Sequence, residues 1–383
     1  MIHSGDNHGA RSGEWQAARE AGARALTPRD PPRAAPSDVI VLDLITTIGE
    51  LEALLPRWRA LWRRIDDATP FQAPEWLIPW WRHLGRGELC VLALRCGERL
   101  VGLVSSTIFH ETVGRRARKF TLMGNGVTDY LDALFEPRLR ADCAAQTFGY
   151  LARLPFRWDL CEFSQLRPES ALFDAALPVT FNAALVLHEP CPVLRFHPGA
   201  RALEDVIPPH QAANVKYYRS RAARFGALEY EPATSKTLAS VLSDLFRLHG
   251  ARWSERGCAG ALAEPAVQRF HREVAQTMLD AGMLRLNRLL LNGRVIAVFY
   301  GFTHRRRSYF YLGGHDPAFS ALSPGTLAIA HALEQALEER VESFDFLRGR
   351  EPYKYLWGAV DTMTYRRSFA DGAKQARKLA AAR

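Results

Sequence analysis

Charged and aromatic side chains crowd behind one short apolar segment, in the stretch FDFLRGREPYKYLWG at residues 344–358. On a strand, Asp345 alternates with the phenylalanines beside it, so its carboxylate points to the opposite face of that strand. A carboxylate on a central strand is costly unless it is paired, so we expect Asp345 to meet a cation or to line a polar cleft. The cations available to it are Arg348, Lys354 and Arg252. A structural ion pair and a functional acid both remain open.

Other groups that could act as acids, bases or anion ligands lie near predicted strand and helix ends. Lys354 is one of only six lysines among 50 basic residues, and its compact charge suits a phosphate or a carboxylate. His249 and Arg252 are one turn apart in LHGARW and share a helix face, which predicts either a common cleft or ordinary packing. His315 and Asp316 directly follow a predicted strand, where either could be a base or part of a simple turn.

Motifs that bind nucleotides or metals are missing from the sequence. It contains no P-loop, G-x-S-x-G, HExxH or catalytic Cys-His arrangement. The six cysteines are scattered, with no C-x-x-C pair and no histidine at ligand spacing: Cys90, Cys96, Cys143, Cys161, Cys191 and Cys258. We therefore predict no metal site, and cysteines that serve as small apolar residues in a reducing cytosol.

Length and composition predict a globular protein with two domains. The chain has 383 residues, 48% of them hydrophobic and 24% charged. No apolar run approaches the ~20 residues that cross a bilayer, and we find no secretory signal, so we expect a cytoplasmic protein without a transmembrane segment. The net charge of +9 arises wholly in residues 201–383. Such a basic half could attract an anionic ligand, although the arginine excess is also typical of a GC-rich genome.

The first half of the chain shows a regular order of predicted elements. A leader, residues 1–37, lacks periodicity and is predicted to be disordered. The elements that follow are a strand from residue 39, a helix over 48–62, a helix over 74–84, a hairpin around 96–99, a strand at 119–124, a helix over 138–153 and strands at 158–163 and 183–187.

The second half repeats this order. Its predicted elements are a strand at 227–232, helices over 236–253 and 264–281, three antiparallel strands at 284–291, 294–302 and 308–314, a helix over 323–340 and strands at 343–347 and 360–369. Asn292-Gly293 is a strong hairpin signal, and Ser323 followed by Pro324 is typical of a helix start. We therefore predict domains at 38–200 and 227–370, a basic connecting helix over 201–226 and a basic flexible tail at 371–383.

The repeated element order resembles the GNAT acyltransferase fold in tandem, as in Fem-type peptidoglycan aminoacyltransferases. The second half is similar to the CelD/BcsL-type acetyltransferases associated with cellulose and exopolysaccharide biosynthesis. The resemblance lies in LFRLHGARWSERG (245–257), SPGTLAIAHALEQAL (323–337) and FDFLRGREPYKYLWG (344–358), and FQAPEWLIPWW (71–81) suits the start of the family's first half. It implies an α/β (α+β) fold of two GNAT-like domains, each a mostly antiparallel, splayed mixed sheet flanked by helices.

The resemblance implies an acyl thioester in a V-shaped gap between the fourth and fifth strands of the second domain. It places the pyrophosphate at the helix start, at Ser323, Gly325 and Thr326, where exposed N–H groups and the helix dipole favour an anion. Single-domain members carry a Gln/Arg-x-x-Gly-x-Gly/Ala turn at this point, whereas this chain has Ser-Pro-Gly. An ordinary helix cap is therefore the alternative. Backbone N–H groups near Leu312 and Gly313 would bind the thioester carbonyl.

Acyl transfer also requires a base for the nucleophile and an acid for the leaving thiolate. The candidates for these catalytic roles are Asp345, Tyr353, Lys354, His315 and Asp316. The candidates for substrate binding are Arg252, His249 and Arg348, with Asp129 and Tyr130 of the segment TDYLDALF on the acceptor side.

The resemblance implies an acyltransferase that uses acetyl-CoA or another acyl-CoA. The acceptor would be an amine or hydroxyl of a small sugar or envelope precursor, reached by direct transfer without a metal and without DNA. One alternative is a Fem-like enzyme that binds aminoacyl-tRNA on the basic connecting helix, at Lys216, Arg219, Arg221 and Arg224. Another is a non-catalytic GNAT-like partner in polysaccharide assembly.

Overall fold

The computed structural model describes residues 39–111, 117–154, 158–254, 257 and 260–372. Residues 40–383 form one structural unit, to which the following description applies. The predicted leader at 1–37 and residues 373–383 of the predicted tail lie outside the described residues. In the described part of the chain, no helix is long and apolar enough to cross a membrane.

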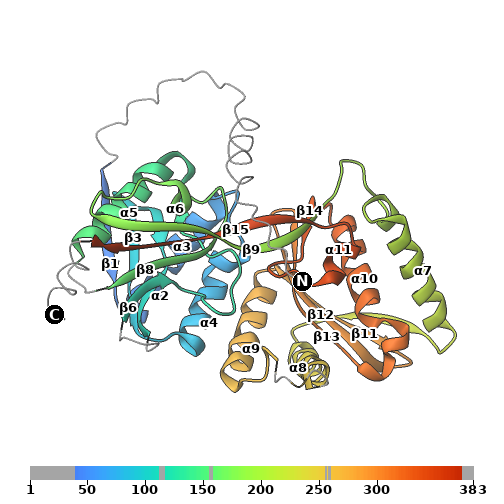
Figure 1. The fold of residues 1–383 in the computed structure, drawn as a ribbon. Helices are drawn as coiled ribbons and strands as arrows, with labels where there is room; N and C mark the ends of the chain where they lie inside the picture. Colours follow the sequence, from blue (N-terminus) through green and yellow to red (C-terminus); the bar gives the residue numbers. More distant parts are fainter. Residues whose placement is uncertain (1–38, 112–116, 155–157, 255–256, 258–259, 373–383) are drawn as a thin grey trace, which may run out of the picture. The chain divides into compact units, whose positions relative to one another are not determined.

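The C-terminal half follows the predicted order closely (Figure 1). Its strands are β10 (Leu228–Pro232), β11 (Leu284–Leu291), β12 (Arg294–His304), β13 (Arg307–His315), β14 (Ser343–Asp345) and β15 (Val360–Asp371). Its helices are α7 (Pro209–Ala223), α8 (Leu238–Ser254), α9 (Pro265–Asp280), α10 (Pro324–Glu338) and α11 (Pro352–Leu356). Short 3-10 turns lie at Leu203–Asp205 and Pro317–Leu322. The hairpin at Asn292-Gly293 is confirmed, because both residues have positive φ angles of 49° and 75°. Helix α11 was not predicted.

The N-terminal half departs further from prediction. Its strands are β1 (Ile40–Ile45), β2 (Glu88–Leu89), β3 (Val91–Cys96), β4 (Arg99–Val104), β5 (Ser106–Glu111), β6 (Ala117–Leu122), β7 (Leu134–Phe135), β8 (Leu160–Leu166) and β9 (Phe181–Arg195). Its helices are α2 (Ile48–Ala53), α3 (Leu55–Arg64), α4 (Pro74–Leu84), α5 (Arg140–Arg153) and α6 (Ala171–Asp174). Short 3-10 turns lie at Pro70–Gln72 and Pro137–Leu139. The helix predicted over 48–62 breaks at Leu54, because Pro56 cannot donate a helical hydrogen bond.

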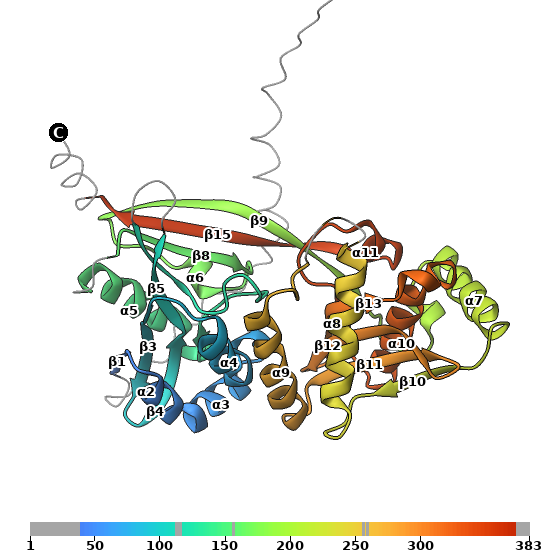
Figure 2. The same cartoon turned by 90° about the horizontal axis from the view of Figure 1, so that it is seen from below.

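The strands form two sheets. One has the order β1-β3-β4-β7, and the other, with eleven strands, has the order β10-β11-β12-β13-β14-β9-β15-β8-β6-β5-β2. The second strand of the hairpin predicted around 96–99, which we expected over residues 100–109, is therefore divided, since β4 and β5 join different sheets. The strand predicted at 183–187 is instead the fifteen-residue β9, which pairs with β14 at one end and runs antiparallel to β15 along most of its length (Figure 2).

Strands β13 and β14 splay apart after a short parallel ladder. Only three residues of β13, Arg307–Tyr309, pair with Ser343–Asp345, whereas β13 continues to His315. Its register against β12 shifts between Tyr300 and Gly301, which leaves Tyr311 as an extra, bulged residue. The splay predicted between the fourth and fifth strands of this half is confirmed.

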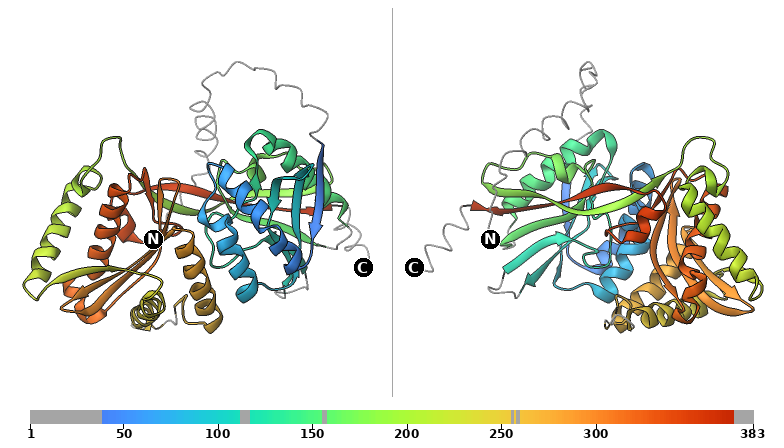
Figure 3. Two further views of the ribbon diagram at one scale, coloured as in Figure 1. Left: turned by 180° about the vertical axis from the view of Figure 1, so that it is seen from behind. Right: turned by 45° about the vertical axis from the view of Figure 1, so that its right-hand side comes forward.

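Different cores lie on the two faces of the C-terminal strands (Figure 3). Helix α10 packs its apolar stripe with Phe299, Phe344 and Trp357 on one face. On the other face, residues of α8 and α9 share a core with the N-terminal half. There the Trp76 ring lies edge-on to Phe270 and Phe302, with ring centroids 5.1 and 5.6 Å apart. A third cluster fills the N-terminal half around α5.

Candidate functional site

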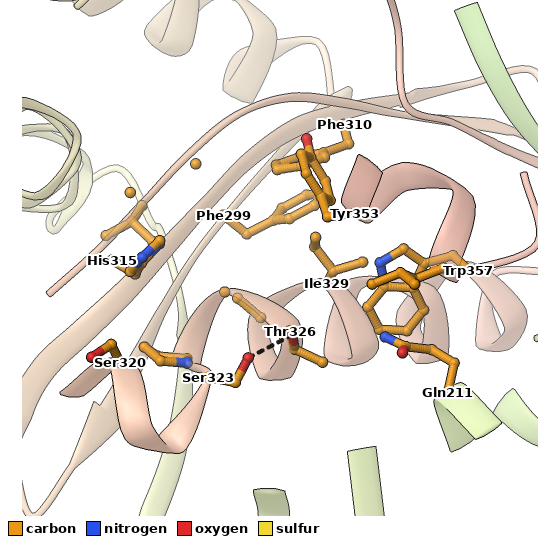
Figure 4. Close-up of a pocket in the computed structure, with 17 residues that line it drawn as sticks. Gln211, Phe299, Phe310, His315, Ser320, Ser323, Thr326, Ile329, Tyr353 and Trp357 are labelled. Carbon is orange, nitrogen blue, oxygen red and sulfur yellow. Dashed lines mark hydrogen bonds between the residues drawn. The ribbon is translucent and has the colours of Figure 1, made fainter. Parts of the chain in front are cut away.

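The splay between β13 and β14 opens a cavity of about 220 Å³, named here the gap cavity (Figure 4). The far end of β13, the start of α10 and the helix α11 form its walls. Its lining residues include Phe310, Gly313, His315, Ser323, Pro324, Gly325, Thr326, Ile329, Tyr353 and Trp357. The gap that the sequence predicted between these elements is therefore present as a cavity.

The start of α10 faces the gap cavity with polar groups. Ser323 occupies the N-cap position with φ of 48°, and its hydroxyl lies 2.8 Å from the Thr326 hydroxyl (Figure 4). The amides of Thr326 and Leu327 donate to the Ser323 carbonyl, whereas the Gly325 amide has no partner within the helix. A Cβ at Gly325 would meet only His315, at 3.5 Å. Helix N-termini favour anions, but among the described residues no Arg or Lys lines the cavity.

A second cavity, of about 260 Å³, lies against α8, α9 and a loop of the N-terminal half; we call it the junction cavity. Its lining residues include Gly126, Val127, Asp129, His249, His271, Tyr311, Leu312, Leu347, Arg348, Glu351 and Lys354. Phe310, Gly313 and Tyr353 line both this cavity and the gap cavity. The two cavities therefore meet at β13, beside the bulge at Tyr311.

The glycines at the end of β13 permit this close arrangement. A Cβ on Gly314 would lie 2.7 Å from the backbone nitrogen of His249, so α8 packs directly against the strand. A Cβ on Gly313 would lie 3.2 Å from the Phe310 ring. Gly314 is buried and Gly313 is partly buried, and a residue without a side chain at position 314 leaves room for the backbone of α8.

Tyr353 lies at the meeting point of the cavities. Its ring centroid is 6.4 Å from that of Phe310 and 6.5 Å from that of Phe346, both at steep interplanar angles (Figure 4). These contacts position the ring on α11, and the residue lines both cavities. Tyr355, two residues later, instead donates its hydroxyl hydrogen to Asp361 and lines neither cavity.

The ammonium of Lys354 is buried and is engaged by its own segment. Its Nζ donates to the carbonyls of Leu347, Arg348 and Gly349 at 3.0, 2.6 and 3.3 Å, and it lies 2.8 Å from Glu351. Only 2% of the residue is exposed. These contacts fold the segment between β14 and α11 around the charge, which gives Lys354 a positioning role in this structure.

The carboxylate of Asp345 forms no salt bridge with a cation of the described residues, but it lines a polar cavity together with Arg167, Arg195 and Arg307. Of the two settings that we expected, a paired cation or a polar cleft, the structure therefore shows the second. Its Oδ2 accepts from the Tyr130 hydroxyl at 2.7 Å, and its Oδ1 accepts from the Leu347 amide at 2.8 Å. Burial raises the pKa of Asp345 to about 6, against the opposing effect of these hydrogen bonds. The expected cations are occupied elsewhere: Lys354 by carbonyls, and Arg348 as described next.

Arg348 joins the two halves of the chain. Its amide and guanidinium lie 3.3 and 3.4 Å from Asp129, and its guanidinium donates to the Gly126 carbonyl at 2.8 Å. Burial raises the pKa of Asp129, although the Arg348 charge opposes this. Of the predicted acceptor-side residues, Asp129 thus reaches the segment after β14 and Tyr130 reaches Asp345 within β14, each from more than 200 residues away in the sequence.

The remaining predicted residues divide between the cavities. His315 lines the gap cavity, and Leu312 and His249 line the junction cavity. Asp316 caps the turn that follows β13 and lies 2.8 Å from Arg294, so it lines neither cavity. Arg252 belongs to α8, but its side chain lies outside the described side chains.

Sequence reasoning missed His271, which is buried on α9 and lines the junction cavity. Burial lowers its pKa to about 3, with a smaller contribution from His249, so its imidazole is neutral. Its Nδ1 lies 3.5 Å from the Tyr300 hydroxyl. The available signal was a histidine among the apolar positions of the helix pattern, which usually indicates only a packed core residue.

Comparison with protein families supports the structural description. Residues 209–355 match the family described as Acetyltransferase (GNAT) domain, a segment that begins at α7 and ends within α11. It contains the strand, helix and segment that line the gap cavity. No curated protein matches the chain.

Solved structures share the fold at low sequence identity. FemX is similar with a TM-score of 0.61 and 7% identity, over 84% of this chain and 97% of that one. The C-terminal DUF2156 domain of a putative lysylphosphatidylglycerol synthetase from Agrobacterium fabrum has a TM-score of 0.53 and 14% identity, over 86% and 94%. A tandem GNAT protein from the clavulanic acid biosynthesis pathway has a TM-score of 0.43 and 14% identity, over 87% and 99%. The predicted fold class, an α/β tandem of GNAT-like domains with mixed sheets, is confirmed.

Proposed function

We propose that this chain is an acyltransferase that moves an acyl group from acyl-CoA to an amine or hydroxyl. The thioester would lie in the gap cavity and the acceptor in the junction cavity. The observation that carries this proposal is that the two cavities meet at Phe310, Gly313 and Tyr353, on opposite sides of the end of β13. A donor and an acceptor held there would approach each other without leaving the protein.

The residues at this meeting point suit each part of acyl transfer. Beyond Tyr309, β13 no longer pairs with β14, so backbone N–H groups near Leu312 and Gly313 that point to that side could stabilise the oxyanion. The neutral imidazole of His271 and the side chain of His249 are candidates to accept the proton of the attacking amine or hydroxyl. Tyr353 would donate its hydroxyl proton to the leaving thiolate. The carbon–sulfur bond breaks as the new carbon–nitrogen or carbon–oxygen bond forms.

The fit to CoA is partial. The hydroxyls of Ser323 and Thr326 and the Gly325 amide would hold the pyrophosphate at the positive end of α10. No Arg or Lys lines that cavity, so donor binding would depend on the helix and on the apolar walls formed by Phe299, Ile329 and Trp357. This composition favours tight contacts with the thioester arm over contacts with the phosphates.

For the acceptor and the family, we propose a CelD/BcsL-type enzyme that acts on a sugar or envelope precursor. The support is the segment at residues 344–358, which encloses the meeting point of the cavities and carries the most specific resemblance. The proposed domains, 38–200 and 227–370 with the connector at 201–226, would then supply the acceptor side and the donor side.

A second candidate is transfer of an amino acid from aminoacyl-tRNA, favoured by the fold that the chain shares with FemX. The basic connector would be the RNA surface. In the structure, however, Arg219 of α7 forms two hydrogen bonds with Glu334 of α10, at 2.8 and 2.6 Å. That contact pairs the charge of one of the four predicted cations with a carboxylate, so we rank this candidate second. A non-catalytic partner is the third.

A ligand-dependent thermal shift would separate these candidates. Acetyl-CoA, longer acyl-CoAs, free CoA and tRNA are each added to the full chain, because any ligand that prefers the native state raises the midpoint of unfolding. We expect acyl-CoA to raise it and tRNA to leave it unchanged. A response to tRNA alone would favour the second candidate, and no response to any CoA species would refute the proposal.

Tyr353→Phe tests the chemistry. It keeps the ring that packs against Phe310 and Phe346 but removes the hydroxyl, so we expect kcat to fall by about 10²–10⁴ with little change in acyl-CoA binding. Release of free thiol from acyl-CoA, with and without acceptor, measures the rate. Tyr355→Phe is the matched control, because its hydroxyl contacts only Asp361 among the hydrogen bonds found. Equal activity of both variants would contradict the assigned role.

A further inference from the structure

A third cavity, of about 150 Å³, lies beside the junction between the two halves, and the proposed acyl transfer makes no use of it. Three arginines line it, so we call it the arginine cavity. The other lining residues are Asp67, Thr69, Tyr130, Glu169, Val193, Tyr309, Ser343, Asp345 and Thr362. Its volume is several times the share of one water molecule in the liquid, about 30 Å³, so it has room for a polyatomic ion or group.

Two of the arginines are positioned by the sheet itself. Ser343 of β14 pairs with Arg307 of β13 on one side and with Arg195 of β9 on the other. Residues that lie directly opposite each other on neighbouring strands point to the same face, so these three side chains form one row across the sheet. The two arginine backbones are about 10 Å apart, with the Ser343 hydroxyl between them.

The third arginine comes from the N-terminal half and is buried. Arg167 is 9% exposed, and its guanidinium donates to the Asp67 carbonyl at 2.8 Å. Its buried Nε has no hydrogen-bond partner. A buried guanidinium with an unused donor is costly unless something accepts from it, and so this position points to a ligand.

The carboxylates in the cavity do not neutralise the row of arginines. Asp67 is paired with Arg140 at 2.6 Å, and Asp345 accepts from Tyr130 and from a backbone amide. Within the described residues, neither Arg195 nor Arg307 forms a salt bridge, although both line a cavity that also contains Glu169. The guanidinium groups that line the cavity therefore have more N–H donors than the acceptors that they contact.

We propose that the arginine cavity binds an oxyanion, a phosphate or a carboxylate group of a ligand. Arg195 and Arg307 would hold it from the two sides of Ser343, and Arg167 would contact it from the opposite wall. A guanidinium presents several N–H groups in one plane, which matches two oxygens of either group. This binding is independent of acyl transfer.

Isothermal titration of the full chain at constant ionic strength tests the proposal. Inorganic pyrophosphate and citrate are titrated separately, as probes for the phosphate and the carboxylate source. The variants are Arg195→Gln and Arg307→Gln, whose side chains lie at exposed positions and whose loss leaves the core intact. Arg306→Gln is the matched control, because this neighbouring arginine is 66% exposed and pairs with Glu342 outside the cavity.

We expect at least one probe to bind, with an affinity about tenfold or more lower in each cavity variant and unchanged in the control. The probe that shows this dependence identifies the phosphate or the carboxylate as the preferred group. The absence of binding by both probes at millimolar concentration would overturn the proposal. Equal weakening by all three substitutions would also overturn it, since that result indicates only the general positive charge of the surface.

Discussion

At the scale of single residues, the charged groups of the segment 344–358 differ in what they do. The sequence presents them as one cluster, but Lys354 is turned inward to the carbonyls of its own segment, Arg348 reaches the Asp129 carboxylate, and Asp345 meets a tyrosine hydroxyl. Only Tyr353 stands at the meeting point of the gap and junction cavities. The cluster therefore builds the wall, and the proposed acyl transfer uses one member of it, Tyr353.

Lys354→Met should destabilise the protein. The substitution removes the donor that three buried carbonyls share, and we expect the free energy of unfolding to fall by roughly 2–4 kcal/mol. Urea denaturation measures it. Arg350→Met, four residues earlier, is the control: this arginine is 68% exposed and lies 3.6 Å from Asp361, so its loss should cost less than about 0.5 kcal/mol. Equal stability of the two variants would mean that the lysine contacts are dispensable.

Asp345 should make stability depend on pH. Its pKa rises from the ordinary 3.8 to about 6 on folding, so its contribution to stability is complete below the ordinary value and is lost as pH rises through about 6. Asp345→Asn stays uncharged and can keep both hydrogen bonds, because the Tyr130 hydroxyl can accept from the amide. As the pH rises from about 4 to about 8, we expect the free energy of unfolding of the variant to increase by roughly 1–3 kcal/mol relative to that of wild type.

Chemical denaturation of both proteins across this pH range would reveal the effect. Both proteins contain the other buried acids with raised pKa values, such as Asp129 and Asp132. The difference between the two stability profiles therefore removes the contribution of these acids. Parallel stability profiles for wild type and variant would show that Asp345 titrates normally.

At the scale of elements, the site depends on how closely α8 approaches β13. The helix backbone at His249 packs over Gly314, and the strand bulges at Tyr311 only a few residues earlier. As a result, the gap cavity and the junction cavity lie close together, with the end of β13 lining both.

Gly314→Ala should therefore disturb this contact. Its Cβ would lie 2.7 Å from a backbone atom and 2.9 Å from the Leu248 side chain, so α8 must shift, at a cost of about 1–3 kcal/mol. Gly250→Ala on the same helix meets nothing within 4 Å and should stabilise by about 0.5–1 kcal/mol, since alanine favours the helix. Thermal unfolding measures both variants, and opposite signs are the expected result. Two changes of the same sign would contradict this account of the packing.

At the scale of the whole unit, the two halves share both a sheet and a core. Strand β9 of the first half supplies the partner of β14, and β15 from the end of the chain pairs with β8 and β9. Trp76 packs against Phe270 and Phe302 across the same junction. Because neither half completes its sheet alone, we expect the described part of the chain to unfold in one cooperative step.

Phe148→Ala tests this cooperativity. The ring is 1% exposed and packs against Phe163 and Phe369, so its loss should cost about 3–5 kcal/mol. Hydrogen exchange of the most protected amides in β11 and β12 should then accelerate together with that of β8, although Phe148 lies in the other half. Phe225→Ala, which removes a ring at a 61% exposed position, should leave exchange unchanged. Acceleration confined to the N-terminal half would indicate independent domains.

Much of the C-terminal half could be predicted from the sequence, because its signals are local. The Asn292-Gly293 turn, the alternation of β11 to β13 and the helix start at Ser323 each depend on residues a few positions apart. The N-terminal half was harder to predict, since the division of β4 from β5 and the length of β9 depend on which sheet each strand joins. Hydrophobic alternation is the same in either sheet.

The sequence by itself determined most strands and helices of the C-terminal half, the splay between its fourth and fifth strands, and several of the chemical groups that lie near it. Only the tertiary structure decided which groups meet: the pairing of Tyr130 with Asp345, the inward turn of Lys354, the place of His271, and the row formed by Arg195, Ser343 and Arg307. The physical reason is that backbone conformation is specified mainly by near neighbours. A buried charge or hydroxyl instead takes its partner from whatever surface packing brings against it, and that surface can come from any part of the chain.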